Sequence, residues 1–208
     1  MMRITGGTLR GRLLRVPASE AVRPTQDQVR AALFSMLGER VAGAVFIDLF
    51  GGTGAVGIEA VSRGASEVVW IEANRNVART LTDNVNTLCE GGTGLLTCAQ
   101  NTKNTGQKTC ATFRVIASDV FAWLKRPPPL HADIIFADPP YGDTETDDRL
   151  AEVMTLLASS SLLKPGGLFI AEQRLRAPQL PVTPPWSLIT ERRYGHTRLS
   201  LFEKTNPM

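Results

Sequence analysis

The feature that most constrains the fold is a regular alternation of short apolar segments with helix-like segments, which begins at Ala44. Buried strands are expected at 44–50, 67–73, 112–119, 132–140 and 165–173, with helices between them, the clearest at 74–88 and 147–163. Such alternation is typical of right-handed βαβ crossovers that form one doubly wound sheet. Segment 187–204 has the pattern of a closing antiparallel pair with a turn near Gly195. We therefore predict an α/β fold with a mostly parallel sheet and helices on both faces.

The first forty residues lie outside this alternation. Segment 3–16 alternates apolar and basic residues around glycines, which is typical of a small β-hairpin. Segment 24–38 has a helical pattern, with Thr25 as the expected N-cap and Gly38 as the expected stop. We expect an N-terminal hairpin extension over residues 1–22 and one larger domain over residues 23–208.

Positive charge is concentrated in the same forty residues. They hold seven arginines, three acids and no lysine, a net +4, so the other 168 residues carry −1 of the chain's net +3. Guanidinium groups match phosphate oxygens, and a cluster of arginines favours nucleic-acid binding. A solvated surface without a partner is the alternative that charge alone leaves open. The candidate RNA-binding residues are Arg3, Arg10, Arg12, Arg15 and Arg23.

Composition argues against several other classes. No apolar run is long enough to span a membrane and no signal peptide is recognisable, so we expect a cytoplasmic protein without a membrane partner. Cys89, Cys98 and Cys110 lack metal-ligand spacing and the two histidines are far apart, so no metal is expected. Segment 91–110 is rich in Gly, Thr, Asn and Gln, and we interpret it as a mobile surface loop. We expect a monomer.

The glycine loop after the first strand is the strongest candidate for a cofactor site. Gly52, Gly54 and Gly57 match the dinucleotide fingerprint, and Glu72 lies twenty residues after Gly52, where an acid would bind a ribose. Asp48, directly before the glycines, argues against NAD because a pyrophosphate there would meet an uncompensated like charge. S-adenosylmethionine carries a sulfonium and an ammonium and no phosphate. The pattern therefore favours S-adenosylmethionine.

A third acid follows the third strand. Asp119 is a candidate partner for the adenine amino group, with Val120 and Phe121 beside the ring. Ligands of open α/β sheets bind at the carboxyl ends of the strands, where these acids would meet. Each acid taken alone is more often an N-cap or a turn residue.

The sequence ADPPY, which ends the fourth strand, is the candidate catalytic motif. The Asp138 carboxylate and the Pro139 carbonyl can accept the two hydrogens of an exocyclic amine and aim its lone pair at a methyl group. Pro140 adds rigidity because proline fixes φ. Tyr141 offers a face on which an extruded base can stack. The alternative is a rigid turn without chemistry.

These motifs, together with RITGGTLRGRLLRVP and RPTQDQVRAALFSML, make the chain resemble the small-subunit methyltransferase D family of 16S ribosomal RNA guanine-N2 methyltransferases. The resemblance implies a Rossmann-like seven-stranded sheet with an antiparallel last strand, and 16S rRNA, within the small ribosomal subunit or its assembly intermediate, as the partner. It also implies that Arg23, Thr25, Asp27 and Arg30 connect the hairpin with the active site. The implied catalytic residues are Asp138, Pro139, Pro140 and Tyr141, and the implied cofactor residues are Asp48, Phe50, Gly51, Gly52, Thr53, Gly54, Glu72, Ala73, Asp119 and Val120.

Other substrates fit the same chemistry. An N6-adenine or N4-cytosine DNA methyltransferase would usually need a recognition domain for which this chain has no room, and glutamine methyltransferases typically carry Asn before the two prolines. An NAD-dependent dehydrogenase is disfavoured by Asp48, and a non-catalytic RNA-binding module by the intact DPPY motif.

Overall fold

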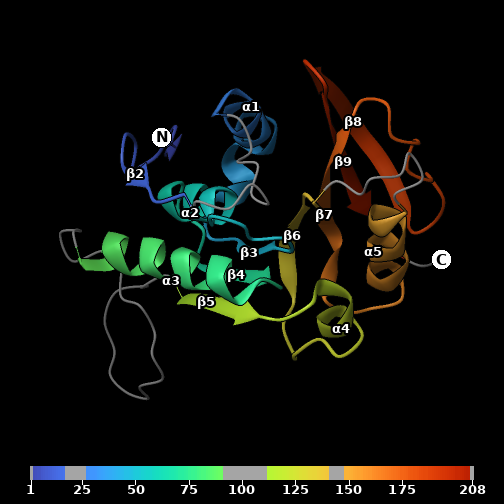
Figure 1. The fold of residues 1–208 in the computed structure, drawn as a ribbon. Helices are drawn as coiled ribbons and strands as arrows, with labels where there is room; N and C mark the ends of the chain where they lie inside the picture. The colour runs from blue at the N-terminus through green and yellow to red at the C-terminus, as the bar shows by residue number, and fades with distance from the viewer. Residues whose placement is uncertain (1, 17–26, 91–111, 141–147, 207–208) are drawn as a thin grey trace.

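The computed structural model describes residues 2–16, 27–90, 112–140 and 148–206. Its main feature is a seven-stranded sheet with the strand order β5-β4-β3-β6-β7-β9-β8 (Figure 1). Strands β3 to β7 are mutually parallel, whereas β9 is antiparallel to both of its neighbours. The strands are β1 (Met2–Arg3), β2 (Leu13–Leu14), β3 (Val45–Asp48), β4 (Glu67–Glu72), β5 (Thr112–Ala117), β6 (Ala132–Ala137), β7 (Leu163–Arg174), β8 (Trp186–Tyr194) and β9 (Thr197–Lys204). The predicted sheet, with its antiparallel last strand, is confirmed.

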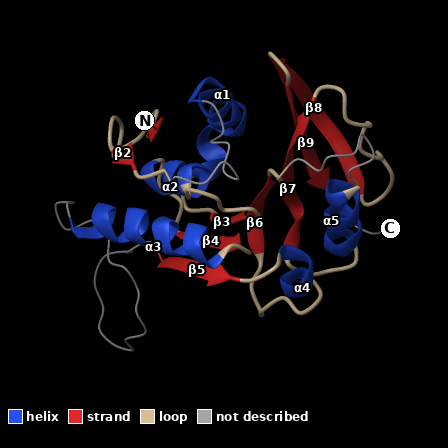
Figure 2. Ribbon diagram, in the orientation of Figure 1, coloured by secondary structure: helices blue, strands red, loops and turns tan. Residues whose placement is uncertain are grey.

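Helices cover both faces of the sheet, as predicted. Figure 2 shows the strands in the middle, with α4 and α5 on the side away from α1 to α3. Apolar residues of α1, α2 and α3 form one core cluster with the sheet, and those of α4 and α5 form a second. The helices are α1 (Asp27–Leu37), α2 (Ala55–Ser62), α3 (Arg75–Glu90), α4 (Val120–Leu124) and α5 (Arg149–Ala158), and η1 (Gly38–Val41) is a 3₁₀ turn.

Alternation along the strands decides which side chains reach which face. Phe46 and Phe136 pack in the cluster of α1 to α3, whereas Ile47 and Ile135 pack in the cluster of α4 and α5. The side chains of even-numbered residues in β3, β4, β6 and β7, and just after these strands end, therefore point to the face covered by α1 to α3.

The predicted N-terminal hairpin is present and is held mainly by contacts with α2. Its ladder comprises only two residue pairs. The N–H groups of Thr8 and Leu9 donate to the carbonyl O and the Oγ of Ser62, each at 2.8 Å. Gly7 is required at this contact because its φ is +73° and a Cβ would lie 2.0 Å from Ser62 O. The hairpin is thus pressed against the last residue of α2 (Figure 1).

Some predicted boundaries differ from the observed ones. Among the described residues the first helix runs from Asp27 to Leu37, and Gly38 adopts a positive φ at its predicted end. Thr25, the boundary at residue 22 and the segment 91–110 lie outside the described residues. None of the helices in the described part of the chain is long and apolar enough to cross a membrane.

Candidate active site

Four acidic side chains gather at the carboxyl edge of the sheet. Asp48 ends β3, Glu72 ends β4, Asp138 follows β6 and Glu172 lies near the end of β7. All four side chains lie on the face covered by α1 to α3, because the residue two positions before each of them packs in the core cluster of those helices. Glu172 was not predicted, although an acid near the end of a predicted strand is the same signal that singled out the others.

Asp48 is almost fully buried, with 2% of its surface exposed. Its Oδ2 accepts a hydrogen bond of 3.2 Å from the N–H of Gly57, in the first turn of α2. Glycine is required at position 57 because a Cβ there would lie 2.2 Å from Trp70 Nε1, whose indole packs against this turn of α2. Burial raises the pKa of Asp48 to about 7; the Gly57 hydrogen bond opposes this and the Glu72 carboxylate adds to it. A buried carboxylate of this kind favours a cationic ligand beside it.

Glu72 shapes the glycine loop. One of its carboxylate oxygens accepts from Gly52 N–H at 2.9 Å and the other from Asn74 N–H at 2.8 Å. Gly54 precedes α2 with a φ of +83°, a conformation that favours glycine. Ala73 is exposed next to Glu72. Each carboxylate oxygen retains a further lone pair that a ligand hydroxyl can use.

Thr53, one of the expected cofactor residues, faces the hairpin instead of open space. Its hydroxyl donates to Met2 Sδ at 3.4 Å, and its side chain is buried. Asn84 Nδ2 donates to the backbone carbonyl groups of both Thr53 and Arg15, at 2.9 Å each. The side chain of Thr53 thus attaches the glycine loop to the hairpin, and only its backbone remains available for a cofactor.

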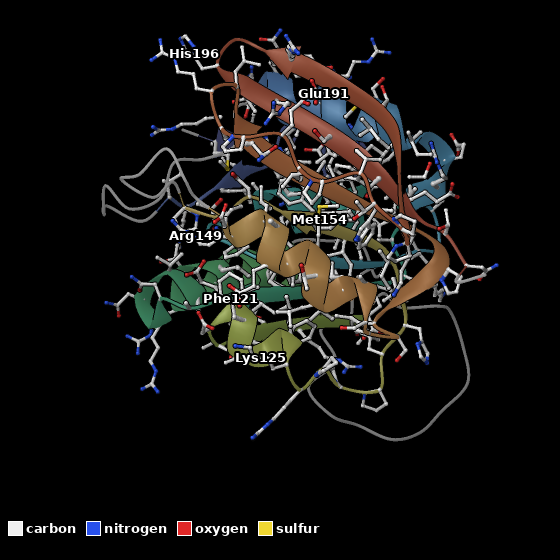
Figure 3. The ribbon with its side chains drawn as sticks, turned by 90° about the vertical axis from the view of Figure 1, so that its right-hand side faces the viewer. Phe121, Lys125, Arg149, Met154, Glu191 and His196 are labelled. Carbon is white, nitrogen blue, oxygen red and sulfur yellow. The ribbon has the colours of Figure 1, made fainter. Side chains whose placement is uncertain are left out.

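Asp119 and its neighbours border the same edge from α4. Asp119 is the N-cap of α4, with Oδ1 accepting from Ala122 N–H at 2.9 Å, and Val120 is buried in the core. Phe121 remains partly exposed and packs edge-on against Phe50 of the glycine loop, with ring centroids 6.5 Å apart. Figure 3 shows Phe121 toward the side of the molecule at which α5 begins, marked by its label Arg149. The pair Phe50 and Phe121 therefore provides an aromatic surface at this edge.

The predicted catalytic motif directly follows β6. Asp138 is half-buried, Pro139 is buried and Pro140 is exposed, so the carboxylate sits where the chain leaves the sheet. Tyr141 lies outside the described residues. Adjacent parallel strands place this motif beside the glycine loop, because β3 and β6 are paired up to Asp48.

Neighbouring carboxylates perturb the acids around this motif. Burial raises the pKa of Asp138 well above its ordinary value, and the negative charges of Glu172 and Asp48 raise it further. Burial also raises the pKa of Glu172 to about 7, although the Arg30 guanidinium acts in the opposite direction. Clustered acids with perturbed pKa values are typical of functional sites.

The predicted RNA-binding residues are only partly described. Four of them have exposed side chains on or beside the hairpin: Arg3, Arg10, Arg12 and Arg15. Arg3 Nε lies 3.5 Å from Asp27 Oδ2, and Arg15 N–H donates to Asn84 Oδ1 at 2.8 Å. Arg23 lies outside the described residues.

A buried ion network links the hairpin with α1 and α2. Arg30 is fully buried; its Nε donates to Glu59 Oε2 at 3.2 Å, and its Nη2 donates to the carbonyl O of Arg3. Glu59 also accepts from Thr5 N–H at 2.8 Å, from Thr5 Oγ1 at 2.6 Å and from Arg63 Nη2 at 2.8 Å. Burial alone would raise the pKa of Glu59, but these hydrogen bonds lower it overall. The expected connection through Arg30 is therefore present, and it reaches the site through the charge of Glu172.

The described part of the chain contains no group of three or more His, Cys, Asp or Glu side chains that could hold a metal ion.

Comparisons with known proteins relate this chain to ribosomal RNA methyltransferases. The chain matches a family model described as conserved hypothetical protein 95 over residues 2–203. It is 33% identical over 204 residues to ribosomal RNA small subunit methyltransferase D of Escherichia coli K12, an alignment that covers 98% of this chain and 90% of the relative. A solved Escherichia coli structure described as a candidate methyltransferase has a TM-score of 0.78 and 29% identity, covering 99% of both chains. The fold is also shared, with a TM-score of 0.63 and 20% identity over 95% of this chain and 46% of the other, by a Thermus thermophilus 16S rRNA N2 G1207 methyltransferase in complex with AdoMet and guanosine.

Proposed function

Because the chain belongs to the small subunit methyltransferase D family of ribosomal RNA methyltransferases, we propose that it transfers a methyl group from S-adenosylmethionine to the N2 amine of one guanine in 16S rRNA. The carbon–sulfur bond of the donor breaks as the new carbon–nitrogen bond forms, and the products are N2-methylguanine, S-adenosylhomocysteine and a proton released from the amine. The observation that carries the proposal is the adjacency of two acids at the ends of paired strands: Asp48, which is buried beside the glycine loop, and Asp138, which is half-buried directly after β6 and before two prolines.

The acids at the sheet edge fit a cationic methyl donor. When bound, S-adenosylmethionine supplies an electrophilic methyl group on a positively charged sulfur. Asp48 would stabilise the positive charge of the donor, and Glu72 would accept hydrogen bonds from the ribose hydroxyls. Asp119 would accept from the adenine amine, and Phe50 and Phe121 would contact the ring. The remaining cofactor contacts would come from the backbone of the loop at Gly51, Gly52, Thr53 and Gly54, with Ala73 and Val120 at its borders.

Asp138 and Pro139 would act as an amine clamp. An exocyclic amine is a weak nucleophile because its lone pair is delocalised into the base. Acceptance of its two hydrogens by the Asp138 carboxylate and the Pro139 carbonyl would localise the lone pair and align it with the methyl group. Tyr141 would stack on the extruded base.

The hairpin would bind the RNA backbone. We propose that residues 1–22 form the RNA-contacting extension of a methyltransferase domain at 23–208, and that Arg3, Arg10, Arg12, Arg15 and Arg23 contact phosphates. The proposed substrate is 16S rRNA within the small ribosomal subunit or an assembly intermediate, bound by a cytoplasmic monomer.

The test is transfer of a labelled methyl group followed by nucleoside analysis. Purified protein is incubated with methyl-labelled S-adenosylmethionine and either unmodified small subunits, naked 16S rRNA or DNA. We expect label in N2-methylguanosine from one of the two RNA substrates. Label in N6-methyladenine, in N4-methylcytosine or only in protein would contradict the proposal.

A further inference from the structure

Glu172 is a buried acid that the amine clamp does not use. Ala171 is in register with Ala137 across β7 and β6, so Glu172 follows at the level of Asp138 on the neighbouring strand. Only 4% of Glu172 is exposed, yet its Oε2 has no hydrogen-bond partner among the described residues. A buried carboxylate oxygen without a donor is costly, and such a group in a native protein calls for an explanation, such as a bound water, ion or ligand or a role in function.

The charges around Glu172 explain how the site tolerates this acid. Asp138, directly after β6, and Asp48 on β3 are like charges on the same face of the sheet. The Arg30 guanidinium, which comes from α1, is an opposite charge that stabilises the ionised form of Glu172. On β9, the residue in register with Glu172 is the apolar Leu199. The protein thus supplies a positive charge behind Glu172 but no hydrogen-bond donor for Oε2 in the described part of the chain.

The free acceptor and the amine clamp together match one base. The Watson–Crick edge of guanine carries two adjacent donor groups, N1–H and the N2 amine. Adenine has an acceptor at N1, and cytosine has an acceptor at N3. Two carboxylates side by side therefore complement guanine, and one of them would face a lone pair in either of the other bases.

We propose that Glu172 is a specificity-determining residue that accepts a hydrogen bond from N1–H of the target guanine, while Asp138 and Pro139 hold its N2 amine. This inference rests on the proposed function and assigns its choice of base. A site built to bind an N–H rejects an analogue that lacks it, because its own buried acceptor is then left unpaired.

RNA that carries 2-aminopurine in place of the target guanine tests the inference. This base retains the 2-amine but presents a lone pair at N1. The target is first mapped with the wild-type protein, and methylation rates are then compared on guanine and 2-aminopurine RNA. We expect the wild type to prefer guanine by at least about 100-fold, since buried polar groups left unpaired give large discrimination.

The variant Glu172→Gln should change this preference. Its carboxamide can donate to the N1 lone pair of 2-aminopurine but offers only one acceptor to guanine. We expect the guanine-to-2-aminopurine ratio to fall at least about tenfold, the effect expected of one hydrogen bond. Because the ratio is compared between two proteins, the intrinsic reactivity of the two amines cancels. Glu203→Gln on the neighbouring strand β9 is the matched control and should keep the wild-type ratio.

The outcomes separate the two proposals. If the wild type forms no N2-methylguanosine, both the proposed function and the role of Glu172 are overturned. If the wild type methylates guanine but treats 2-aminopurine equally well, only the role of Glu172 is overturned, even if the variant does not fold. An equal loss on both bases in Glu172→Gln would likewise assign Glu172 a purely structural role beside Arg30.

Discussion

To hold an amine as proposed, Asp138 has to be ionised, and its surroundings oppose ionisation. Burial and the carboxylates of Glu172 and Asp48 raise its pKa. A bound cation at this edge would lower the pKa again, since an opposite charge nearby favours the ionised form. The clamp would therefore become fully effective only once the methyl donor is in place.

Replacement of Asp138 by alanine tests the clamp directly. We expect Asp138→Ala to lower the rate of methyl transfer by about 10²–10³-fold, the usual effect of removing one preorganised transition-state contact. Affinity for S-adenosylmethionine should stay within a few-fold, since other residues hold the donor. The measurement is single-turnover transfer beside calorimetric cofactor binding. Asp83→Ala, at an exposed position on α3, is the control and should behave as the wild type. Transfer by Asp138→Ala at the wild-type rate would contradict the clamp.

For individual residues, the sequence predicts where a side chain lies better than it predicts what the side chain contacts. Asp48, Glu72 and Asp138 were predictable because a strand end fixes where a following side chain lies. Glu172 carries the same strand-end signal, but it was missed because neither a glycine loop, a ribose-acid spacing nor a proline pair accompanies it in the sequence. The role of Thr53 was also hidden, because its hydroxyl faces Met2, which is 51 residues away in sequence.

The hairpin is an element whose own ladder is too short to hold it in place. An isolated two-stranded hairpin is at best marginally stable in water, and this one has two residue pairs. Its position depends on Ser62 and Glu59 of α2 and on Asn84 of α3. The hairpin pattern was therefore readable from the sequence, but its place on the domain was not, because it depends on contacts between residues 53 to 69 positions apart.

The hairpin arginines should contribute through phosphate contacts. We expect the triple variant Arg10→Ala, Arg12→Ala and Arg15→Ala to weaken RNA binding and to reduce the slope of log K against log salt by about 2 to 3. The measurement is filter binding over a salt series. The control removes Arg40, Lys125 and Arg126, which are exposed and precede β3 and β6 in the chain. An unchanged slope in the hairpin variant would exclude phosphate contacts by these arginines.

The buried ion network should matter for stability. Glu59→Gln leaves Arg30 and Arg63 without their shared carboxylate, so we expect unfolding to become easier by about 3–5 kcal/mol. Urea unfolding measures this loss. The double variant Arg30→Met and Glu59→Gln removes both buried charges and should recover part of the loss. A Glu59→Gln protein as stable as the wild type would show that the network contributes little.

For the whole molecule, the acids at the sheet edge link stability to pH. The folded-state pKa values of Asp48 and Glu172 are both raised, to about 7, so the stability that they contribute is complete below pH 4 and is lost as pH rises through 7. We expect this contribution to the free energy of unfolding to decline between about pH 4 and pH 8, by about 4 kcal/mol for Asp48 alone. Urea titrations across this range measure the decline.

Asp48→Asn is the matched variant for this prediction, since it cannot ionise and should show a flatter dependence on pH. S-adenosylmethionine should raise the melting temperature of the wild type more at pH 8 than at pH 6, because a cation binds the ionised site better. Identical pH profiles for the wild type and Asp48→Asn would contradict the raised pKa of Asp48.

The anchored hairpin has one more consequence. Ser62, Glu59 and Asn84 fasten the hairpin backbone to the same layer of helices that covers the acids at the sheet edge, so the hairpin keeps a fixed place relative to that edge. Under the proposed function, the fold would therefore set the distance between the phosphate contacts of the hairpin and Asp138. An RNA would be accepted only if its folded shape places a reachable guanine at this distance from a run of phosphates. The tertiary structure of the RNA, more than its local sequence, would then select the nucleotide that is modified.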